Sequence, residues 1–271
     1  MKKRSNFLIV AIIMLGLTTM LSSCGQAEKK TATDRIKETG ELVVATSGNQ
    51  FPFSFKDTDG VLKGIDIELA NLLAKDMGVK ARFVEQDLST IISYVASDKA
   101  DIAISSLTVT EERSKFVSFS DPYFVTGKGV LSKIKEVQDA KEGTPNEGGK
   151  YKIAVVENSS SVDYAKKHYP KAHLLLTNNV DESREALYTG KVDGLLADYE
   201  ICETLSFDKR NNGEYDFERI GDASEKQYIS VAVAPGDSLL LKEVNTLIHK
   251  LKKGEIDEKV EEKWMMYLNL N

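Results

Sequence analysis

Two charged residues of the sequence stand where they could bind a small polar ligand. Arg113 closes a polar loop, and a guanidinium can bind a carboxylate through two parallel hydrogen bonds. Asp198 follows the strand-like run 193–197, and a carboxylate buried at a strand end needs a polar partner. Simpler roles stay open for both residues. Arg113 could be a solvated cation or a partner of Glu111 or Glu112. Asp198 could be a turn residue.

A polar cluster at residues 158–160 lies between an apolar run and a predicted helix. Backbone N–H groups in the first turn of a helix have no helical partners, so this turn could bind an anion. Asn158 is the non-glycine residue type that best tolerates a left-handed turn. Ser159 and Ser160 could also act simply as helix caps, and the two roles are compatible.

The elements that would position these residues follow one plan twice. Apolar runs and segments of helical periodicity give the order β-α-β-α-β over residues 42–46, 65–77, 81–85, 88–96 and 101–104. The same order returns over residues 152–156, 160–168, 172–176, 181–188 and 193–197. This alternation predicts two α/β lobes with parallel sheets, whose ligands bind beyond the carboxyl ends of the strands. We therefore expect the polar clusters to meet in a cleft between the lobes.

Two segments of the chain are predicted to connect the lobes. Residues 119–125 lead to the second lobe and residues 228–232 lead back, so they could form a hinge. Helical periodicity over residues 239–251 and 256–264 predicts two last helices that complete the first lobe. The predicted lobes comprise residues 35–125 plus 228–271 and residues 126–227.

The N-terminus has the order of a bacterial export signal. Basic residues at positions 2–4 precede an apolar run at 7–20 that is short for a membrane span. Small residues then precede Cys24, and this pattern resembles the bacterial lipobox. The resemblance implies a signal peptide of residues 1–23, a lipid on Cys24 and a flexible tether over residues 24–34. An ordinary secretory signal with an accidental cysteine is the alternative.

Composition argues against several classes of protein. The 271 residues carry a formal net charge of −6 and no basic stripe, which argues against binding to nucleic acid. Three histidines and the lack of HExxH or CxxC spacing argue against a catalytic metal site. With Cys24 lipidated, Cys202 stands alone, and we interpret it as a buried apolar filler.

Three motifs in order resemble the polar-amino-acid family of bacterial extracellular solute-binding proteins, family 3. GIDIEL at 64–69 resembles the family signature, SSLTVTEER at 105–113 its binding loop, and FSDPY at 119–123 the usual sequel. The resemblance covers about residues 35–268. It implies the two-lobed fold of type II periplasmic-binding proteins, with two mainly parallel sheets and a two-strand hinge. We interpret the first motif as a packing and helix-capping segment, because acidic residues are favourable near a helix N-terminus.

The resemblance also implies an amino-acid site with the ligand carboxylate on Arg113 and the ammonium on Asp198. The implied ligand-binding residues are Ser106, Thr108, Arg113, Ser159, Ser160, Asp198, Gln50, Phe51, Phe53 and Leu88. Asn158 replaces the usual glycine of the family. Ser47 replaces an aspartate that many relatives with cationic ligands carry, which weakens a lysine or arginine assignment. Phe53 could equally belong to the core.

The implied function is that of an extracytoplasmic lipoprotein that delivers a polar amino acid to the permease of an ABC importer. It needs no cofactor, and we expect a monomer that is not an enzyme. Two alternatives stay open. One is a dehydratase that acts on cyclic diene acids, because enzymes of that class share this fold. Glu157 would be its proton donor. The other is a ligand sensor or adhesin that serves no transporter.

Overall fold

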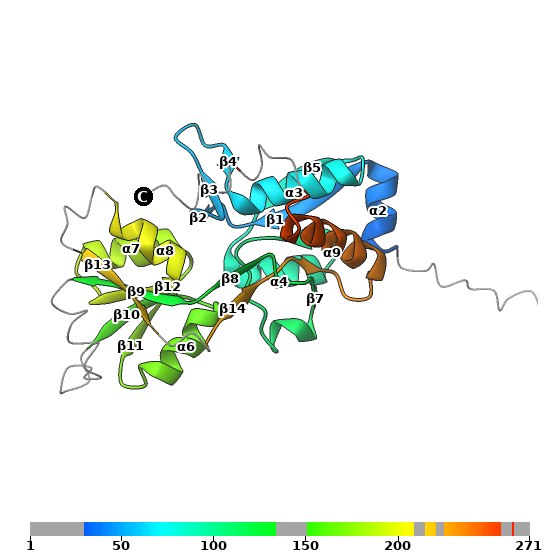
Figure 1. Cartoon of the computed structure of the whole chain (residues 1–271). Coiled ribbons are helices and arrows are strands. Elements are labelled where there is room, and N and C mark those ends of the chain that lie inside the picture. The colour runs from blue at the N-terminus through cyan, green and yellow to red at the C-terminus, as the bar shows by residue number, and fades with distance from the viewer. Residues whose placement is uncertain (1–29, 134–150, 209–214, 221–224, 256–261, 263–271) are drawn as a thin grey trace, which may run out of the picture. The chain divides into compact units, whose positions relative to one another are not determined.

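Two separate five-stranded sheets form the centre of the folded chain. The structure is a computed structural model that describes residues 30–133, 151–208, 215–220, 225–255 and 262. Residues 32–271 form one compact unit, in which strands alternate with helices along the chain (Figure 1). The two-lobed α/β architecture predicted from the sequence is therefore confirmed.

The first sheet has the strand order β5-β1-β6-β15-β7. Its strands are β1 (Glu41–Thr46), β5 (Lys80–Glu85), β6 (Ile102–Ala103), β7 (Ser118–Phe119) and β15 (Ala232–Val233). The first three are parallel, and β15 is antiparallel to β6 and β7. Along β1, Leu42 and Val44 face one hydrophobic cluster, whereas Val43 and Ala45 face another. This two-residue period is why the apolar run forms a strand covered on both faces.

Helices cover both faces of the first sheet. One face carries α2 (Ala32–Thr39), α3 (Ile65–Asp76) and α9 (Ser238–Lys252), and the other carries α4 (Leu88–Ala96). On α9, the buried residues recur at helical spacing, and each contributes about 1.5–3 kcal/mol by burial. They are Leu240, Val244, Leu247 and Ile248.

Helix α2 begins at Ala32, inside the segment predicted as a tether. The reason is an anchor from the far end of the chain. The carboxylate of Asp237 accepts hydrogen bonds from the Thr33 backbone N–H and hydroxyl, both at 2.7 Å. Residues 32–34 therefore belong to the folded unit rather than to a flexible linker.

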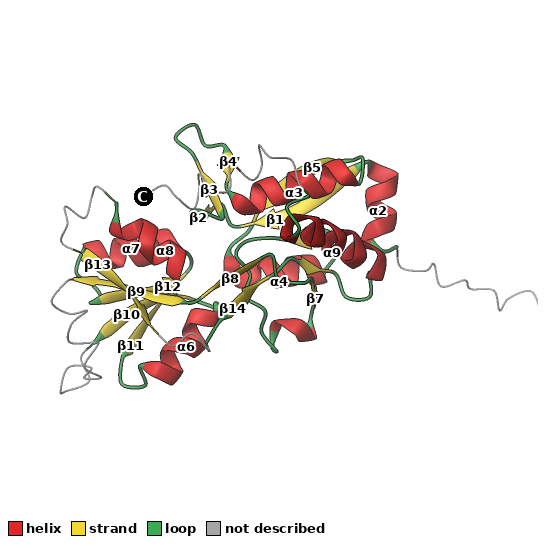
Figure 2. Ribbon diagram, viewed as in Figure 1, coloured by secondary structure: helices red, strands yellow, loops and turns green. Residues whose placement is uncertain are grey.

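The second sheet has the strand order β11-β10-β12-β9-β13. Its strands are β9 (Lys128–Lys133), β10 (Lys152–Val156), β11 (His173–Thr177), β12 (Gly194–Asp198) and β13 (Tyr215–Ile220). Strands β10, β11 and β12 are parallel, and β9 is antiparallel to β12 and β13. Helix α6 (Ser160–His168) packs on one face, and α7 (Val180–Tyr188) and α8 (Tyr199–Ser206) pack on the other (Figure 2).

Short elements link and extend the two sheets. Strand β8 (Phe124–Thr126) pairs antiparallel with β14 (Gln227–Ile229), where the chain crosses between the sheets. A small antiparallel sheet contains β2 (Asn49–Gln50), β3 (Ser54–Lys56) and β4 (Leu62–Lys63). A short 3₁₀ helix, η2 (Arg113–Lys115), follows the polar loop after β6.

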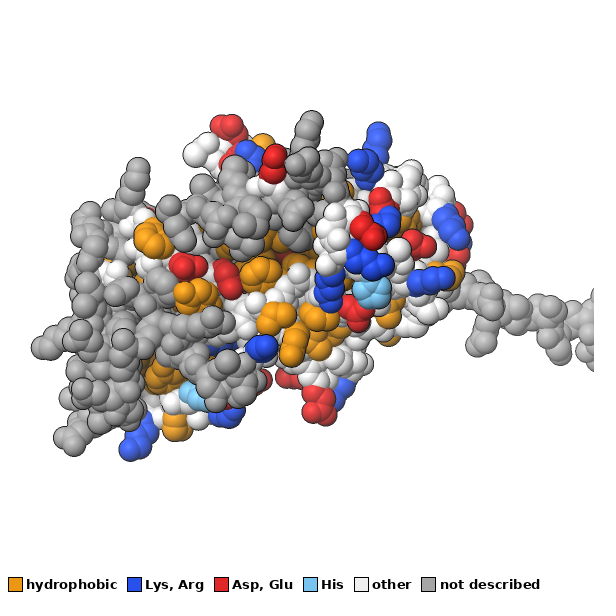
Figure 3. All heavy atoms as spheres, viewed as in Figure 1, with side chains coloured by type: hydrophobic (Ala, Val, Ile, Leu, Met, Phe, Trp, Pro, Cys, Tyr) orange, Lys and Arg blue, Asp and Glu red, His pale blue; other side chains and the backbone are white. Residues whose placement is uncertain are grey.

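The described surface mixes charges of both signs. On the face shown in Figure 3, basic side chains lie among acidic ones over the region of α9. There Lys250 pairs with Asp76 at 2.7 Å, and His249 lies 2.8 Å from Asp121. None of the described helices combines the length and apolar character that crossing a membrane requires. The predicted helix at 256–264 and the segment around Cys24 lie outside the described residues, apart from Glu262.

Candidate ligand-binding site

Three charged side chains, those of Arg113, Lys128 and Asp198, line one small cavity between the lobes. Arg113 follows the loop after β6, and Asp198 ends β12. Lys128 begins β9, and because β9 is antiparallel to β12, its first residue lies at the same sheet edge as Asp198. The cavity holds about 30 Å³, which is room for about one or two water molecules. An amino acid would enter only after the lobes separate.

The Arg113 guanidinium joins the two lobes. Its Nη1 donates to the Thr108 carbonyl in the first lobe, and its Nη2 donates to the Asn158 carbonyl in the second, both at 2.9 Å. Partial burial lowers the pKa of Arg113, and the nearby Asp198 carboxylate opposes that shift. The two N–H groups are those that a ligand carboxylate could take over.

A chain of hydrogen bonds surrounds Asp198. Its Oδ1 accepts from Lys128 Nζ at 2.5 Å, and its Oδ2 accepts from the Ser106 hydroxyl at 3.3 Å. Lys128 Nζ also donates to Ser160 Oγ at 2.8 Å, and Ser160 Oγ donates to Thr108 Oγ1 at 3.0 Å. Five polar residues from both lobes therefore form one connected network around the cavity.

The polar loop is held in shape by a buried carboxylate. Ser106 has a positive φ of 44°, and its N–H donates to Asp66 Oδ2 at 2.8 Å. The other Asp66 oxygen accepts from the Tyr123 hydroxyl at 2.6 Å. Burial raises the pKa of Asp66 to about 6. The sequence pattern indicates packing and capping for Asp66, and the structure adds a role in positioning the polar loop.

The turn before α6 adopts the conformation expected from its sequence. Asn158 has a φ of 55°, the left-handed region that asparagine tolerates. Ser159 is the N-cap residue, but its hydroxyl donates to the Val156 carbonyl instead of capping α6. Ser159 and Ser160 both line the small cavity.

The predicted side-chain pocket is only partly present. Gln50 and Leu88 line the cavity, and Gln50 Oε1 accepts from the Ser105 hydroxyl at 3.0 Å. Phe53 is fully buried and contacts Phe124 edge-to-face, with ring centroids 5.2 Å apart, so it belongs to the core.

Phe51 also lies away from the small cavity. Its ring packs against the ring of Phe55 in β3, with a centroid distance of 4.6 Å. Neither Phe51 nor Phe53 is among the cavity-lining residues.

Lys128 lines the cavity but was not predicted from the sequence. In the sequence it is a single lysine between two glycines, which is typical of an exposed turn. In the structure it is 2% exposed. Its position depends on the register of β9 against β12, in which Lys128 pairs with Asp198. Only that register, which no local pattern encodes, could have placed it in the cavity.

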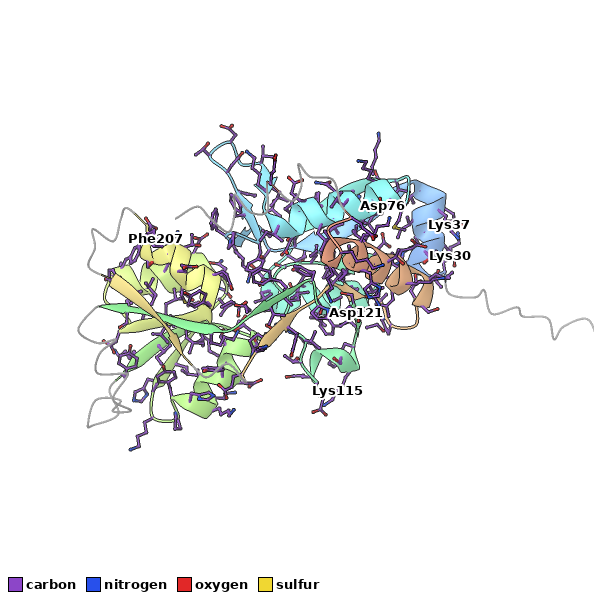
Figure 4. All side chains as sticks on the ribbon, viewed as in Figure 1. Lys30, Lys37, Asp76, Lys115, Asp121 and Phe207 are labelled. Carbon is purple, nitrogen blue, oxygen red and sulfur yellow. The ribbon has the colours of Figure 1, made fainter. Side chains whose placement is uncertain are left out.

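A larger cavity of about 660 Å³ adjoins the first and shares Leu88, Arg113, Ser159 and Ser160 with it. It is lined by α4, the η2 segment and α6, and Phe116 and Lys166 lie at it. Lys115, two residues beyond Arg113, is exposed and projects from η2 (Figure 4). Glu157, the candidate acid of the enzyme alternative, lines neither of these two cavities.

Two further expectations from the sequence concern Cys202 and metal binding. Cys202 is fully buried beneath the sheet, and burial raises the pKa of its thiol to about 12, as expected for a filler. Over the part of the chain that the structure describes, no group of three or more His, Cys, Asp or Glu side chains could hold a metal ion.

Comparisons with known proteins show the family and the fold. The family model of bacterial extracellular solute-binding proteins, family 3, matches residues 42–267. The ABC transporter glutamine-binding protein GlnH of Bacillus subtilis (strain 168) is 29% identical over 268 residues, which cover 95% of this chain and 94% of that protein. The crystal structure of an ancestral amino acid-binding protein, a precursor of cyclohexadienyl dehydratase, has a TM-score of 0.75 at 31% identity and covers 86% of this chain and 99% of that one.

An enzyme is also similar to the chain. Cyclohexadienyl dehydratase of Pseudomonas aeruginosa is 28% identical over 200 residues, which cover 73% of each protein. Both binding proteins and a dehydratase therefore share the fold and much of the sequence pattern.

Proposed function

The chain belongs to the bacterial extracellular solute-binding proteins of family 3, and on that premise we propose that its interlobe cavity binds a free polar amino acid for an ABC importer. The single observation that carries the proposal is the placement of Arg113 and Asp198 in one cavity. An amino acid carries a carboxylate and an ammonium a fixed distance apart. A guanidinium and a carboxylate contributed by opposite lobes are complementary to that pair.

Binding is proposed to proceed by opening and closing of the lobes. We propose that the described parts of residues 32–125 and 228–255 form one lobe, that those of residues 126–227 form the other, and that the β8–β14 pair serves as the hinge. The interlobe bonds from Arg113 to Asn158 and from Ser160 to Thr108 separate on opening. The ligand replaces them on closing, and each charge-assisted hydrogen bond contributes about 1.5–3 kcal/mol. Micromolar affinity requires about 8 kcal/mol net, so four or five such contacts suffice after ordering costs.

The N-terminal segment is proposed to anchor the protein outside the cytoplasm. Residues 1–23 have the features of a lipoprotein signal, and Cys24 stands at the lipobox position. Two acyl chains give stable membrane anchoring. A lipidated Cys24 would hold the folded unit, which begins at Ala32, close to the permease.

A dehydratase is the second candidate, because such an enzyme is among the relatives. Elimination of a hydroxyl needs a positioned acid. Asp198 is engaged by the Lys128 ammonium, and Glu157 lines neither described cavity. These contacts favour binding over catalysis. Incubation with prephenate and arogenate tests this directly, and aromatic product formed at a rate proportional to protein concentration would support the enzyme.

The test of the binding function is a thermal-shift screen of residues 25–271 against the free amino acids. We expect one amino acid, or a small related group, to raise the melting temperature, because a ligand of the folded state stabilises it by mass action. Arg113→Ala should abolish the shift. Lys115→Ala, which removes an exposed cation two residues away, is the matched control and should keep it. No shift with any amino acid would refute the proposal.

A further inference from the structure

Lys128 places a second cation in the cavity, directly on Asp198. Its side chain is 1% exposed, and its Nζ lies 2.5 Å from Asp198 Oδ1. Its neighbours Ser106, Thr108 and Ser160 belong to the cavity wall, not to the hydrophobic core. Lys128 therefore faces the space that the ligand must occupy.

The charges around the cavity do not match a neutral zwitterion. Arg113 and Lys128 are the two cations among the lining residues, and Asp198 is the one anion, so the described lining carries a net charge of +1. A neutral amino acid has one carboxylate for Arg113 and one ammonium for Asp198. One buried cation then lacks a counter-charge, and an uncompensated buried charge is costly.

The hydrogen bonds of Lys128 leave a donor for the ligand. An ammonium has three N–H groups. Two acceptors, Asp198 Oδ1 and Ser160 Oγ, are found for it within the described part of the chain. The third N–H can bind a ligand oxygen. Asp198 Oδ2, now held at 3.3 Å by the Ser106 hydroxyl, can accept the ligand ammonium while Oδ1 keeps Lys128.

We propose that Lys128 makes this site selective for amino acids whose side chain carries a carboxylate. This inference rests on the proposed function, because it assumes an amino acid in the cavity. An acidic amino acid brings two carboxylates and one ammonium, a net charge of −1 that balances the lining. The polar wall around Gln50 agrees with this selectivity, because its neighbours Ser47 and Ser105 supply hydroxyls and no carboxylate for a cationic side chain.

A purely structural ion pair is the alternative role for Lys128, since it bridges two neighbouring strands. The two roles differ in what they predict. A structural pair would affect stability equally with any ligand present. A specificity residue would change the ratio of affinities for ligands of equal size and different charge.

The test is calorimetric titration of residues 25–271 with glutamate and glutamine, and with aspartate and asparagine, which form pairs of nearly equal size. For at least one pair, we expect the wild-type protein to bind the acid about tenfold or more tightly than its amide. Lys128→Gln should bring that ratio close to one, and Lys128→Arg should keep the preference because it keeps the charge. Lys115→Gln, the exposed lysine, should leave the ratio unchanged.

The wild-type measurement decides the matter even if a Lys128 variant does not fold. Tighter binding of an amide, of arginine or of lysine than of the acids would overturn the selectivity and leave the proposed function standing. An unchanged acid-to-amide ratio in a folded Lys128→Gln protein would also overturn it. No binding of any amino acid would overturn both proposals.

Discussion

The shape of the polar loop at 105–113 depends on one buried carboxylate. Asp66 accepts hydrogen bonds from the Ser106 N–H and the Tyr123 hydroxyl, and both of these donors are neutral. Two neutral donors compensate its burial incompletely, which is why its pKa rises to about 6. The left-handed Ser106 is therefore fixed by a group whose ionisation destabilises the folded state.

This residue predicts a specific dependence of stability on pH. The folded-state pKa of Asp66 lies above its unfolded value of 3.8, so the folded protein binds more protons between about pH 4 and 6. Stability from this group is present at low pH and is lost as pH rises through 6. The wild-type free energy of unfolding, relative to that of Asp66→Asn, should fall by about 2 kcal/mol between pH 4.5 and 7.5. Urea unfolding at both values measures it, and parallel pH profiles would contradict the role.

At the scale of elements, Asp237 joins helix α2 to the beginning of helix α9. This residue caps α9 by accepting from the Leu240 N–H at 3.0 Å, and it binds Thr33 of α2 through two more hydrogen bonds. The α2 and α9 helices share one hydrophobic cluster with β1. One side chain thus fixes where the folded unit begins.

Asp237→Ala should lower the free energy of unfolding by about 2 kcal/mol, because it removes a helix cap and two buried hydrogen bonds. Asp87→Ala is the matched control, since Asp87 is also an N-cap residue but its side chain makes no capping bond to α4. The control should change stability by less than about 0.5 kcal/mol. Equal losses in the two variants would show that capping propensity alone, and not the Thr33 anchor, explains the effect.

Elements with strong local patterns were predictable, and elements defined by distant pairing were not. The run at 42–46 and the periodicity of 88–96 predicted β1 and α4 closely. Strand β9 and helix α8 were not predicted, because β9 owes its place to antiparallel pairing with β12 and β13. The two-residue strand β15 is likewise too short to carry a pattern of its own, whereas β6 lies inside the strand predicted at 101–104.

The site divides in the same way. Arg113, Ser160 and Asp198 follow predicted strands or begin a predicted helix, so their meeting could be expected from strand order. The position of Lys128 could not be expected, since a shift of one residue in the pairing of β9 with β12 would turn its side chain to the opposite face of the sheet. Phe53 could not be assigned from the sequence either, because an aromatic beside a cleft serves a core or a pocket equally well, and here it is fully buried.

At the scale of the whole molecule, the proposed binding depends on two lobes that each contribute half of the proposed site. Ser106, Thr108 and Arg113 come from the first lobe, and Lys128, Ser160 and Asp198 from the second. Hydrogen bonds now join these groups across the cavity, and a ligand would use the same donors and acceptors. In the proposed mechanism, opening and closing exchange one set of interlobe contacts for another, and only a ligand that contacts both lobes favours the closed state.

The most direct measurement is a crystal structure of residues 25–271 with the amino acid identified by the thermal-shift screen. We predict that the ligand lies between the lobes, with its α-carboxylate on the Arg113 guanidinium and its ammonium on Asp198 Oδ2. The volume around Arg113, Lys128 and Asp198 should expand from the present 30 Å³ to hold it. A ligand seated in the larger cavity beside Phe116, or bound without contact to both Arg113 and Asp198, would contradict the proposed site.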